Sequence, residues 1–251
     1  MTSWFTHSAP WFGTVAQWFS VIATLIAVGV ALFKDEFFRW RNRPILKATL
    51  RPGAPDCAKA VLFLKYQESP VGRADCYYIR LWVENAGRGR AQDVQIYAAN
   101  LYRWDAGAGR FGRVESFLPM NLVWAHSQPG EREVFARGIA SSMGRHCDLG
   151  HVVDPKAGPP FGVPQVDAVL GRCSFTLAVE ASPNTGSHIL EADRYVIELH
   201  IAGSNSGRVT CFVQIALDGR WYDDPETMLS TGITAQVLSS SPIQRYGYHQ
   251  G

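Results

Sequence analysis

The first 33 residues of this chain contain no Lys, Arg, Asp or Glu. A secretory signal peptide needs a positive charge before its apolar run and a cleavage site of small residues after it, and neither is present. The apolar run is also longer than that of a usual signal peptide, and Lys34-Asp35-Glu36 follows it directly. We therefore expect this segment to remain in the mature protein.

The uncharged run extends from Trp11 to Phe33, which is 23 residues. A helix of this length crosses a hydrocarbon core of roughly 30 Å. Aromatic residues gather at both ends, as they do at membrane–water interfaces. A buried core helix is the alternative, but such helices seldom run this long without a charge. The pattern predicts a short external tail at 1–10 and a transmembrane helix at 11–33.

The next segment, 34–43, is a basic juxtamembrane region that we expect to continue the helix until Pro44 stops it. Basic residues on one flank of a span place that flank in the cytoplasm. The prediction is therefore a single-pass protein of a bacterial inner membrane, with its N-terminus outside and its C-terminal domain cytoplasmic. The basic side chains would meet anionic lipid headgroups. They are Lys34, Arg39, Arg41 and Arg43.

Small and polar residues recur along the predicted span at alternating intervals of four and three. Such spacing places them on one face, where small side chains let membrane helices pack closely. The face could mediate self-association, or line a narrow pore in a ring of copies. Chance is the alternative, because these residue types are common in membrane helices. The members are Gly13, Gln17, Ser20, Thr24, Ala27 and Ala31.

Motifs for catalysis are scarce. The chain has no P-loop lysine motif, no G-x-S-x-G and no D-x-D-x-D-G loop. Gly107 to Gly112 matches G-x-G-x-x-G, but Pro119 ends the following stretch before a helix could form, so a hairpin loop is expected. We therefore expect no enzyme and no cofactor.

Metal-binding spacing is also lacking, since neither a C-x-x-C pair nor H-E-x-x-H occurs. Cys147 and His151, with His146, Asp148 and Asp154 nearby, are of metal-ligand types but not in such a pattern, and no metal is predicted. The five cysteines are an odd number, which fits a reducing compartment.

Strand patterns dominate the region 44–238. Alternation of apolar and polar residues is clearest at 78–84, 173–180, 195–201 and 209–215, and the last two flank a hairpin sequence at 203–207. Weaker candidates lie at 45–50, 61–66, 94–104, 120–124 and 133–139. About eight short strands without long helices between them favour an antiparallel β-sandwich. One short helix is expected to begin at Asp224-Pro225, and 239–251 is expected to be a flexible tail.

A local motif supports this fold class. The segment 80–96 resembles the strand–turn–strand of bacterial immunoglobulin-like domains, L-x-V-x-N-x-G followed by A-x-x-V-x-I. The resemblance implies an all-β, immunoglobulin-like antiparallel sandwich after the transmembrane helix, and it implies no activity. The matching residues are Leu81, Val83, Asn85, Gly87, Ala91, Val94 and Ile96.

Two arginine-containing loops are candidate ligand sites. Arg88 and Arg90 alternate with glycines, and Arg110 and Arg113 flank Phe111-Gly112. Guanidinium groups beside exposed backbone N–H groups suit anions. Aromatic residues near in sequence could stack on bases; they are Tyr78, Trp82, Trp104 and Phe111. The alternative is that both loops are solvated hairpin tips.

The overall organisation resembles single-span bacterial antiphage effectors. This resemblance implies a cytoplasmic β domain that senses a nucleotide-type or oligonucleotide signal, and a cyclic homo-oligomer whose helices permeabilise the inner membrane. The alternative is a non-conducting membrane adaptor whose β-sandwich recruits a protein partner encoded alongside. A membrane-bound enzyme comes third, because no residue pattern favours it.

Overall fold

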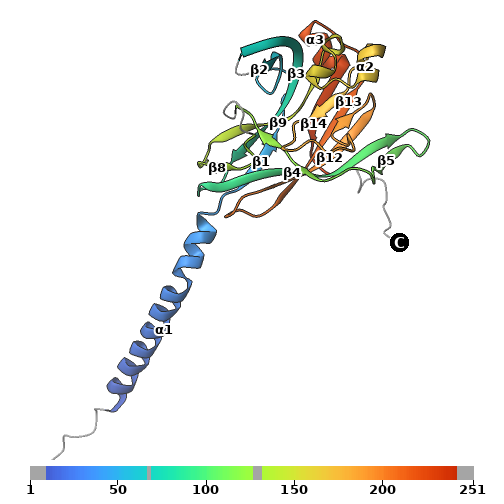
Figure 1. Ribbon diagram of the computed structural model, residues 1–251. Helices are drawn as coiled ribbons and strands as arrows, with labels where there is room; N and C mark the ends of the chain where they lie inside the picture. Colours follow the sequence, from blue (N-terminus) through green and yellow to red (C-terminus); the bar gives the residue numbers. More distant parts are fainter. Residues whose placement is uncertain (1–9, 67–68, 127–131, 242–251) are drawn as a thin grey trace, which may run out of the picture. The chain divides into compact units, whose positions relative to one another are not determined.

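The computed structural model describes residues 10–66, 69–126 and 132–241 (Figure 1). The chain divides into two compact units, Met1–Arg43 and Pro44–Gly251. The predicted tails at 1–10 and 239–251 lie mostly outside the described residues.

The first unit contains one helix, α1 (Pro10–Arg41), of 32 residues. It includes the predicted span and most of the basic segment. Its large apolar side chains are well exposed along the described part, for example Trp18 at 68 % and Leu32 at 69 %. Among the residues that the structure describes, no helix meets both the length and the apolarity needed to cross a membrane. The segment predicted to be transmembrane is thus shown only as a helix.

The second unit contains two antiparallel sheets. The first sheet has the order β1-β3-β9-β10-β11, with β2 beside β3 and β7 beside β9. Its strands are β1 (Leu46–Thr49), β2 (Cys57–Tyr66), β3 (Ser69–Asn85), β7 (Val123–Trp124), β9 (Gly144–Val153), β10 (Phe175–Leu177) and β11 (Ile189–Leu190).

The second sheet has the order β14-β13-β12-β4-β5, with β6 and β8 beside β4. Its strands are β4 (Ala91–Asp105), β5 (Arg110–Arg113), β6 (Met120–Asn121), β8 (Ala136–Ile139), β12 (Arg194–Ala202), β13 (Val209–Leu217) and β14 (Ile233–Leu238). The chain passes from the first sheet to the second through the link 86–90, between β3 and β4.

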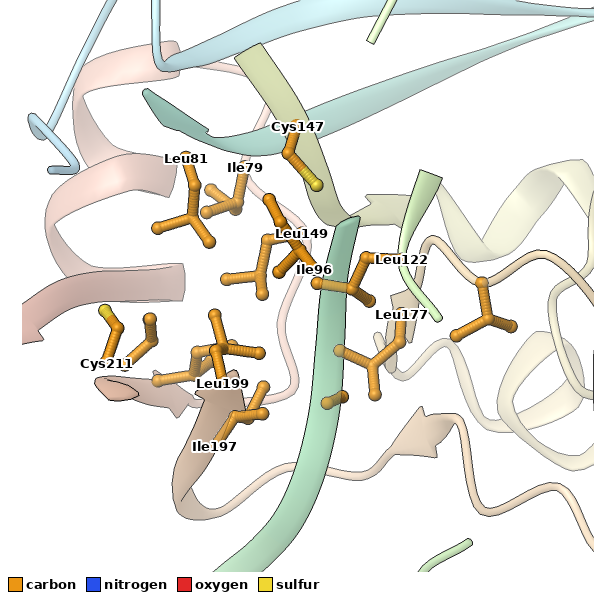
Figure 2. Close-up of a cluster of buried hydrophobic side chains, with 14 of the residues drawn as sticks. Ile79, Leu81, Ile96, Leu122, Cys147, Leu149, Leu177, Ile197, Leu199 and Cys211 are labelled. Carbon is orange, nitrogen blue, oxygen red and sulfur yellow. The ribbon is translucent and has the colours of Figure 1, made fainter. Parts of the chain in front are cut away.

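The two sheets enclose one hydrophobic core. Alternate side chains of β3, among them Ile79 and Leu81, are at most 1 % exposed, as are Ile197 and Leu199 of β12. All belong to one cluster, and Figure 2 shows them facing the same interior. Shared burial of the two inner faces is the arrangement of a β-sandwich. The prediction of an all-β antiparallel body is confirmed.

Strands with unbroken alternation were predicted best. The segments 78–84, 195–201 and 209–215 lie within β3, β12 and β13, and the hairpin at 203–207 joins the last two. The predicted short helix is α3 (Pro225–Thr227), capped by Asp224, whose side chain accepts a hydrogen bond from the Thr227 amide. A π-helical turn, Met228–Gly232, follows it.

Two predictions in the first sheet need correction. The strand expected at 173–180 is only the three residues of β10. The ten-residue strand β9 was not predicted, because its His, Cys and Asp residues are of metal-ligand types and do not alternate regularly with apolar residues. A register shift opposite Ile79 and Arg80 breaks the alternation of β9. Cys147 and Leu149 therefore face the core, while His151 pairs with Tyr78 on the outer face.

Short helices cover part of that outer face. They are η1 (Pro155–Ala157), η2 (Pro159–Phe161) and α2 (Gln165–Leu170). Ala157, Phe161 and Val163 pack with Cys76 of β3 and Val153 of β9 in a second, smaller apolar cluster. This cover explains why one end of the first sheet is buried on both faces.

Asn85 fixes the crossing between the sheets. Its side chain is fully buried, and its Oδ1 accepts hydrogen bonds from the amides of Ile45 (3.1 Å) and Gly87 (3.0 Å). Its Nδ2 donates to the carbonyl oxygens of Gly89 (2.6 Å) and Ile139 (3.1 Å). One amide thus joins the start of β1, the link 86–90 and the end of β8.

We expect Asn85→Ala to lower the free energy of unfolding by roughly 3 kcal/mol, because the substitution leaves backbone groups of the crossing without partners. Urea unfolding of the purified chain measures this value. Asn205→Ala is the matched control: Asn205 also bonds backbone atoms, but it is exposed, so a loss below about 1 kcal/mol is expected. Equal losses in the two variants would show that Asn85 has no special role.

Candidate functional site

The structure places the six predicted ligand-binding residues in three separate locations. Arg88 and Arg90 lie in the link before β4, whereas Arg110 and Arg113 lie on β5, which pairs with the far end of β4. A strand rises about 3.3 Å per residue, so the 11 steps from Ala91 to Tyr102, which pairs with Arg113, separate the two pairs by roughly 35 Å. One small ligand cannot contact both.

The hairpin of β4 and β5 combines aromatic and basic side chains on one face. Trp104 and Phe111 are directly opposite each other, with ring centroids 5.1 Å apart in an edge-to-face arrangement. The guanidinium of Arg194, on β12, lies 4.2 Å from the centroid of the Trp104 ring. Arg113 pairs with Tyr102 on the same face. We call these five residues the hairpin corner.

An open depression of about 550 Å³ adjoins the hairpin corner. Arg103 and Asp193 line it, and the Nε of Arg103 donates to the Asp193 carboxylate at 2.7 Å. This hydrogen bond is the main reason that the pKa of Arg103 is raised. Arg113 is less engaged, since its nearest carboxylate, that of Glu115, is 4.0 Å away and both side chains are largely exposed.

A polar network continues from the hairpin corner along the outer face of the second sheet. The Glu198 carboxylate accepts hydrogen bonds from Asn100 (2.9 Å) and Tyr102 (3.2 Å), and lies 3.0 Å from Nε2 of His200. Burial alone would raise the pKa of Glu198, but these hydrogen bonds outweigh it and the pKa is lowered. Glu198 is therefore ionised at neutral pH and fixes the Tyr102 side chain beside Arg113.

Tyr78 and Trp82 lie elsewhere, on the outer face of β3, and rings from β9 contact both of them. Tyr78 packs against His151 with centroids 5.2 Å apart, and Trp82 against His146 at 4.8 Å. Burial raises the pKa of Tyr78 to about 12. Between them Arg80 donates to Asp148 at 2.9 Å and lies over the Tyr78 ring. These contacts fit a packing role for both aromatic residues.

A buried carboxylate, that of Asp56, adjoins these side chains of β3 and β9. Asp56 is fully buried, and its oxygens contact Nε2 of His146 at 3.0 Å and the Arg51 backbone amide at 2.9 Å. Burial acts to raise the pKa of Asp56, but hydrogen bonds from His146 and Arg51 reverse the effect, so the pKa is lowered. The cluster joins the loop before β2 to β9.

Arg194 belongs to the hairpin corner, but no pattern in the sequence predicted it as a site residue. It is about 90 residues from Trp104 along the chain, and only the pairing of β12 with β4 brings it there. Trp104 and Phe111 could be predicted as neighbours of Arg110 and Arg113, because all four lie in one hairpin. Among the described residues, no cluster of three or more His, Cys, Asp or Glu side chains is arranged to hold a metal.

Comparison of the chain with protein-family models, with curated proteins and with solved structures finds no match. The geometry of the hairpin corner and of α1 is thus the basis for the function proposed below.

His151 makes a pH-dependent contribution to stability that can be measured. Burial, together with the positive charge of Arg132, lowers its pKa from 6.5 to about 4. As pH falls below 6.5 the unfolded chain binds the proton first, so the free energy of unfolding decreases by up to about 1.4 kcal/mol per pH unit until the folded pKa is reached. We expect His151→Leu to reduce this decrease, as measured by urea unfolding at pH 7 and pH 4.5.

The control for this experiment is His126→Asn. His126 is exposed and has a positive φ of 60°, which Asn tolerates. It should keep the acid sensitivity of the parent chain. If His151→Leu keeps that sensitivity as well, another group is responsible for it.

Proposed function

We propose that the protein is a membrane-anchored effector of bacterial, antiphage type. In this proposal α1 inserts into the inner membrane and associates with α1 of other copies, and the β-sandwich, of immunoglobulin-like type, binds a nucleotide-type or oligonucleotide signal. The observation that carries the proposal is the apolar surface of α1. Its exposed Phe19, Leu25 and Ile26 side chains are 62–69 % accessible, and such a surface is stabilised by lipid or by other apolar helices.

Self-association is supported by the sorting of side chains on α1. Gln17, Ser20, Thr24, Ala27 and Ala31 are all exposed in the single chain. The Thr24 hydroxyl donates to the Ser20 carbonyl at 2.8 Å, so it needs no further partner for that proton. Gln17 can hydrogen-bond across an interface, and the small residues permit close approach. Gly13 continues this face towards the N-terminus, at a position where side-chain surroundings lie outside the described residues.

A ring of such helices would place this face around a central path, which is the basis for proposing permeabilisation. A cyclic homo-oligomer is the closed arrangement that one repeated interface produces. The orientation follows from the basic residues Lys34, Arg41 and Arg43, which favour a cytoplasmic sandwich.

The signal site is assigned to the hairpin corner. The exposed Arg194 and the Trp104 and Phe111 rings offer stacking surfaces for a base, and Arg113 offers charge for phosphate. Arg110, opposite Asp105 at the start of β5, lies beside the hairpin corner and adds a second positive charge. Glu198 and Tyr102 provide a fixed polar border. The adjoining depression of about 550 Å³, to which Trp104 and Arg113 contribute, is of suitable size for a mononucleotide or part of a short single strand.

A non-conducting adaptor is the second candidate function. An observation that favours it is the exposed apolar surface of α2, where Val166, Val169 and Leu170 are 56, 73 and 58 % accessible. Patches of this kind mark protein-binding surfaces. In this case α1 would be only an anchor, and a partner protein encoded alongside would bind the sandwich.

The two functions differ in what the polar face of α1 does. We expect the triple substitution Gln17→Leu, Ser20→Leu and Thr24→Leu to abolish both the oligomer and any depolarisation of cells that make the full-length chain. Leu fills the space between helices and makes any water path apolar, while insertion is retained because the helix becomes more apolar. The measurements are the mass of the purified protein in detergent and the membrane potential of the cells that make it.

Ile22→Leu with Ile26→Leu is the matched control, because these residues lie outside the polar face and change little in volume. This variant should keep the parent's mass and activity. If the triple variant also keeps both, the polar face is incidental and the adaptor function is favoured. A parent chain that is monomeric in detergent contradicts the effector function.

The signal site has its own test, which uses a fluorescent single-stranded oligonucleotide and the detergent-solubilised chain. Arg110→Ala with Arg113→Ala should weaken binding at least tenfold and reduce the slope of log affinity against log salt by up to about 1.4, since two phosphate contacts are lost. Trp104→Ala should weaken binding by about 1–3 kcal/mol through lost stacking.

Arg88→Ala with Arg90→Ala removes the same charge from the other end of β4 and should leave oligonucleotide affinity unchanged. Stability should change by less than about 0.5 kcal/mol in either double variant, because all four arginines are exposed or partly exposed. An equal loss of affinity in the two double variants would argue for non-specific charge attraction.

A further inference from the structure

Three loops and the start of β1 are held together at one end of the sandwich. The Asn85 amide donates to the Met143 carbonyl at 2.9 Å, and the Ser141 hydroxyl donates to the Gly87 carbonyl at 2.6 Å. These bonds join the link 86–90 to the turn 140–143. Asn205 joins the β12–β13 hairpin to the link, because its Nδ2 donates to the Arg90 carbonyl at 2.8 Å. We call this surface the link end.

The link end is basic. Its three loops, 86–90, 140–143 and 203–208, contain no acidic residue. Four arginines at this end are exposed: Arg88, Arg90, Arg137 and Arg208. Arg90 lies over Gly138 of β8, so closely that a Cβ there would overlap its guanidinium, and Arg137 precedes Gly138 on the same strand. Three acids flank the link end. Glu84 is opposite Lys47 on β1, and Asp93 accepts a hydrogen bond from Ser204. Glu133 is paired with Arg145 and also interacts with the charge of Arg137.

The link end also exposes apolar side chains. Met143 is 61 % and Ile45 is 45 % accessible, and both are bonded through their backbones to Asn85. Asn85 itself is buried and held by hydrogen bonds, so the backbones of Met143 and Ile45 are held in place. Exposed apolar groups among arginines, without acidic residues in the loops, are complementary to a surface that is anionic outside and apolar beneath.

We propose that the link end docks on the surface of an anionic bilayer. Arg88, Arg90 and Arg137 would contact lipid phosphates, and Met143 would enter the boundary between headgroups and acyl chains. The choice of a bilayer as partner rests on the proposed insertion of α1. Ile45 follows the last residue of α1 by four positions, a stretch that covers at most about 14 Å when extended.

A full-length chain in lipid nanodiscs tests this proposal. One set of discs contains phosphatidylcholine alone, and the other contains phosphatidylcholine with phosphatidylglycerol. A nitroxide on Met143→Cys reports depth through its collision rates with oxygen and with a water-soluble nickel chelate. The five native cysteines are buried, which keeps them from the label. We expect position 143 to be at headgroup depth in the anionic discs and in water in the neutral ones.

Charge substitutions supply the second arm of the test. Reversal of three arginines, Arg88→Glu, Arg90→Glu and Arg137→Glu, should return the label at position 143 to water in anionic discs. The milder pair Arg88→Gln with Arg90→Gln should reduce the docked fraction, at about fivefold per arginine removed, and guards against misfolding of the triple variant. A label on Val169→Cys, 73 % exposed on α2, is the control and should stay in water in both discs.

The outcomes separate this proposal from the proposed function. A label at position 143 that stays in water in anionic discs, or that is equally deep in neutral discs, overturns the anionic docking surface. A label on Leu25→Cys in the same discs reports insertion of α1. If position 25 is in water while position 143 still shows depth that depends on phosphatidylglycerol, the docking surface stands and the membrane-spanning role of α1 fails.

Discussion

The buried amide of Asn85 is the contact on which the arrangement of the sandwich depends. A polar side chain without access to water is tolerated only when its hydrogen bonds are complete, and here all four go to backbone atoms. Because its partners come from β1, the link 86–90 and β8, the amide sets where the chain leaves one sheet and enters the other. The positions of Arg88, Arg90 and Met143 follow from that crossing.

The alternation of apolar and polar residues predicted strands correctly where one face is buried and the other is exposed to solvent. β12, β13 and the C-terminal part of β3 meet this condition, and their alternating residues are found in the core. β9 does not, because a register shift interrupts its alternation and short helices cover part of its outer face. His151 is therefore partly buried, with its Nδ1 shielded from solvent, although it lies outside the main core. In the sequence, polar residues of such a strand resemble metal ligands and give no sign that they belong to a sheet.

The candidate site could be predicted only as far as one hairpin extends. Arg110 and Arg113 are near Trp104 both in sequence and in space, since a hairpin returns the chain directly. Arg88 and Arg90 are equally near in sequence, but an extended strand carries residues apart at about 3.3 Å each. Arg194 shows the converse, because sheet pairing joins residues that are distant along the chain. No local pattern contains that information.

The net charge of the chain, +2, conceals two arginine-rich surfaces that differ in their neighbours. At the hairpin corner, arginines lie beside Trp104 and Phe111, and flat rings add stacking to charge, which suits a base with its phosphate. At the link end, arginines lie beside the flexible Met143 and branched Ile45, and these groups can enter disordered acyl chains but offer no stacking plane. The sign of the charge attracts an anion to either surface. Under the two proposals, the neighbouring apolar groups determine which anion gains additional contact: a base with its phosphate at the hairpin corner, and a lipid headgroup at the link end.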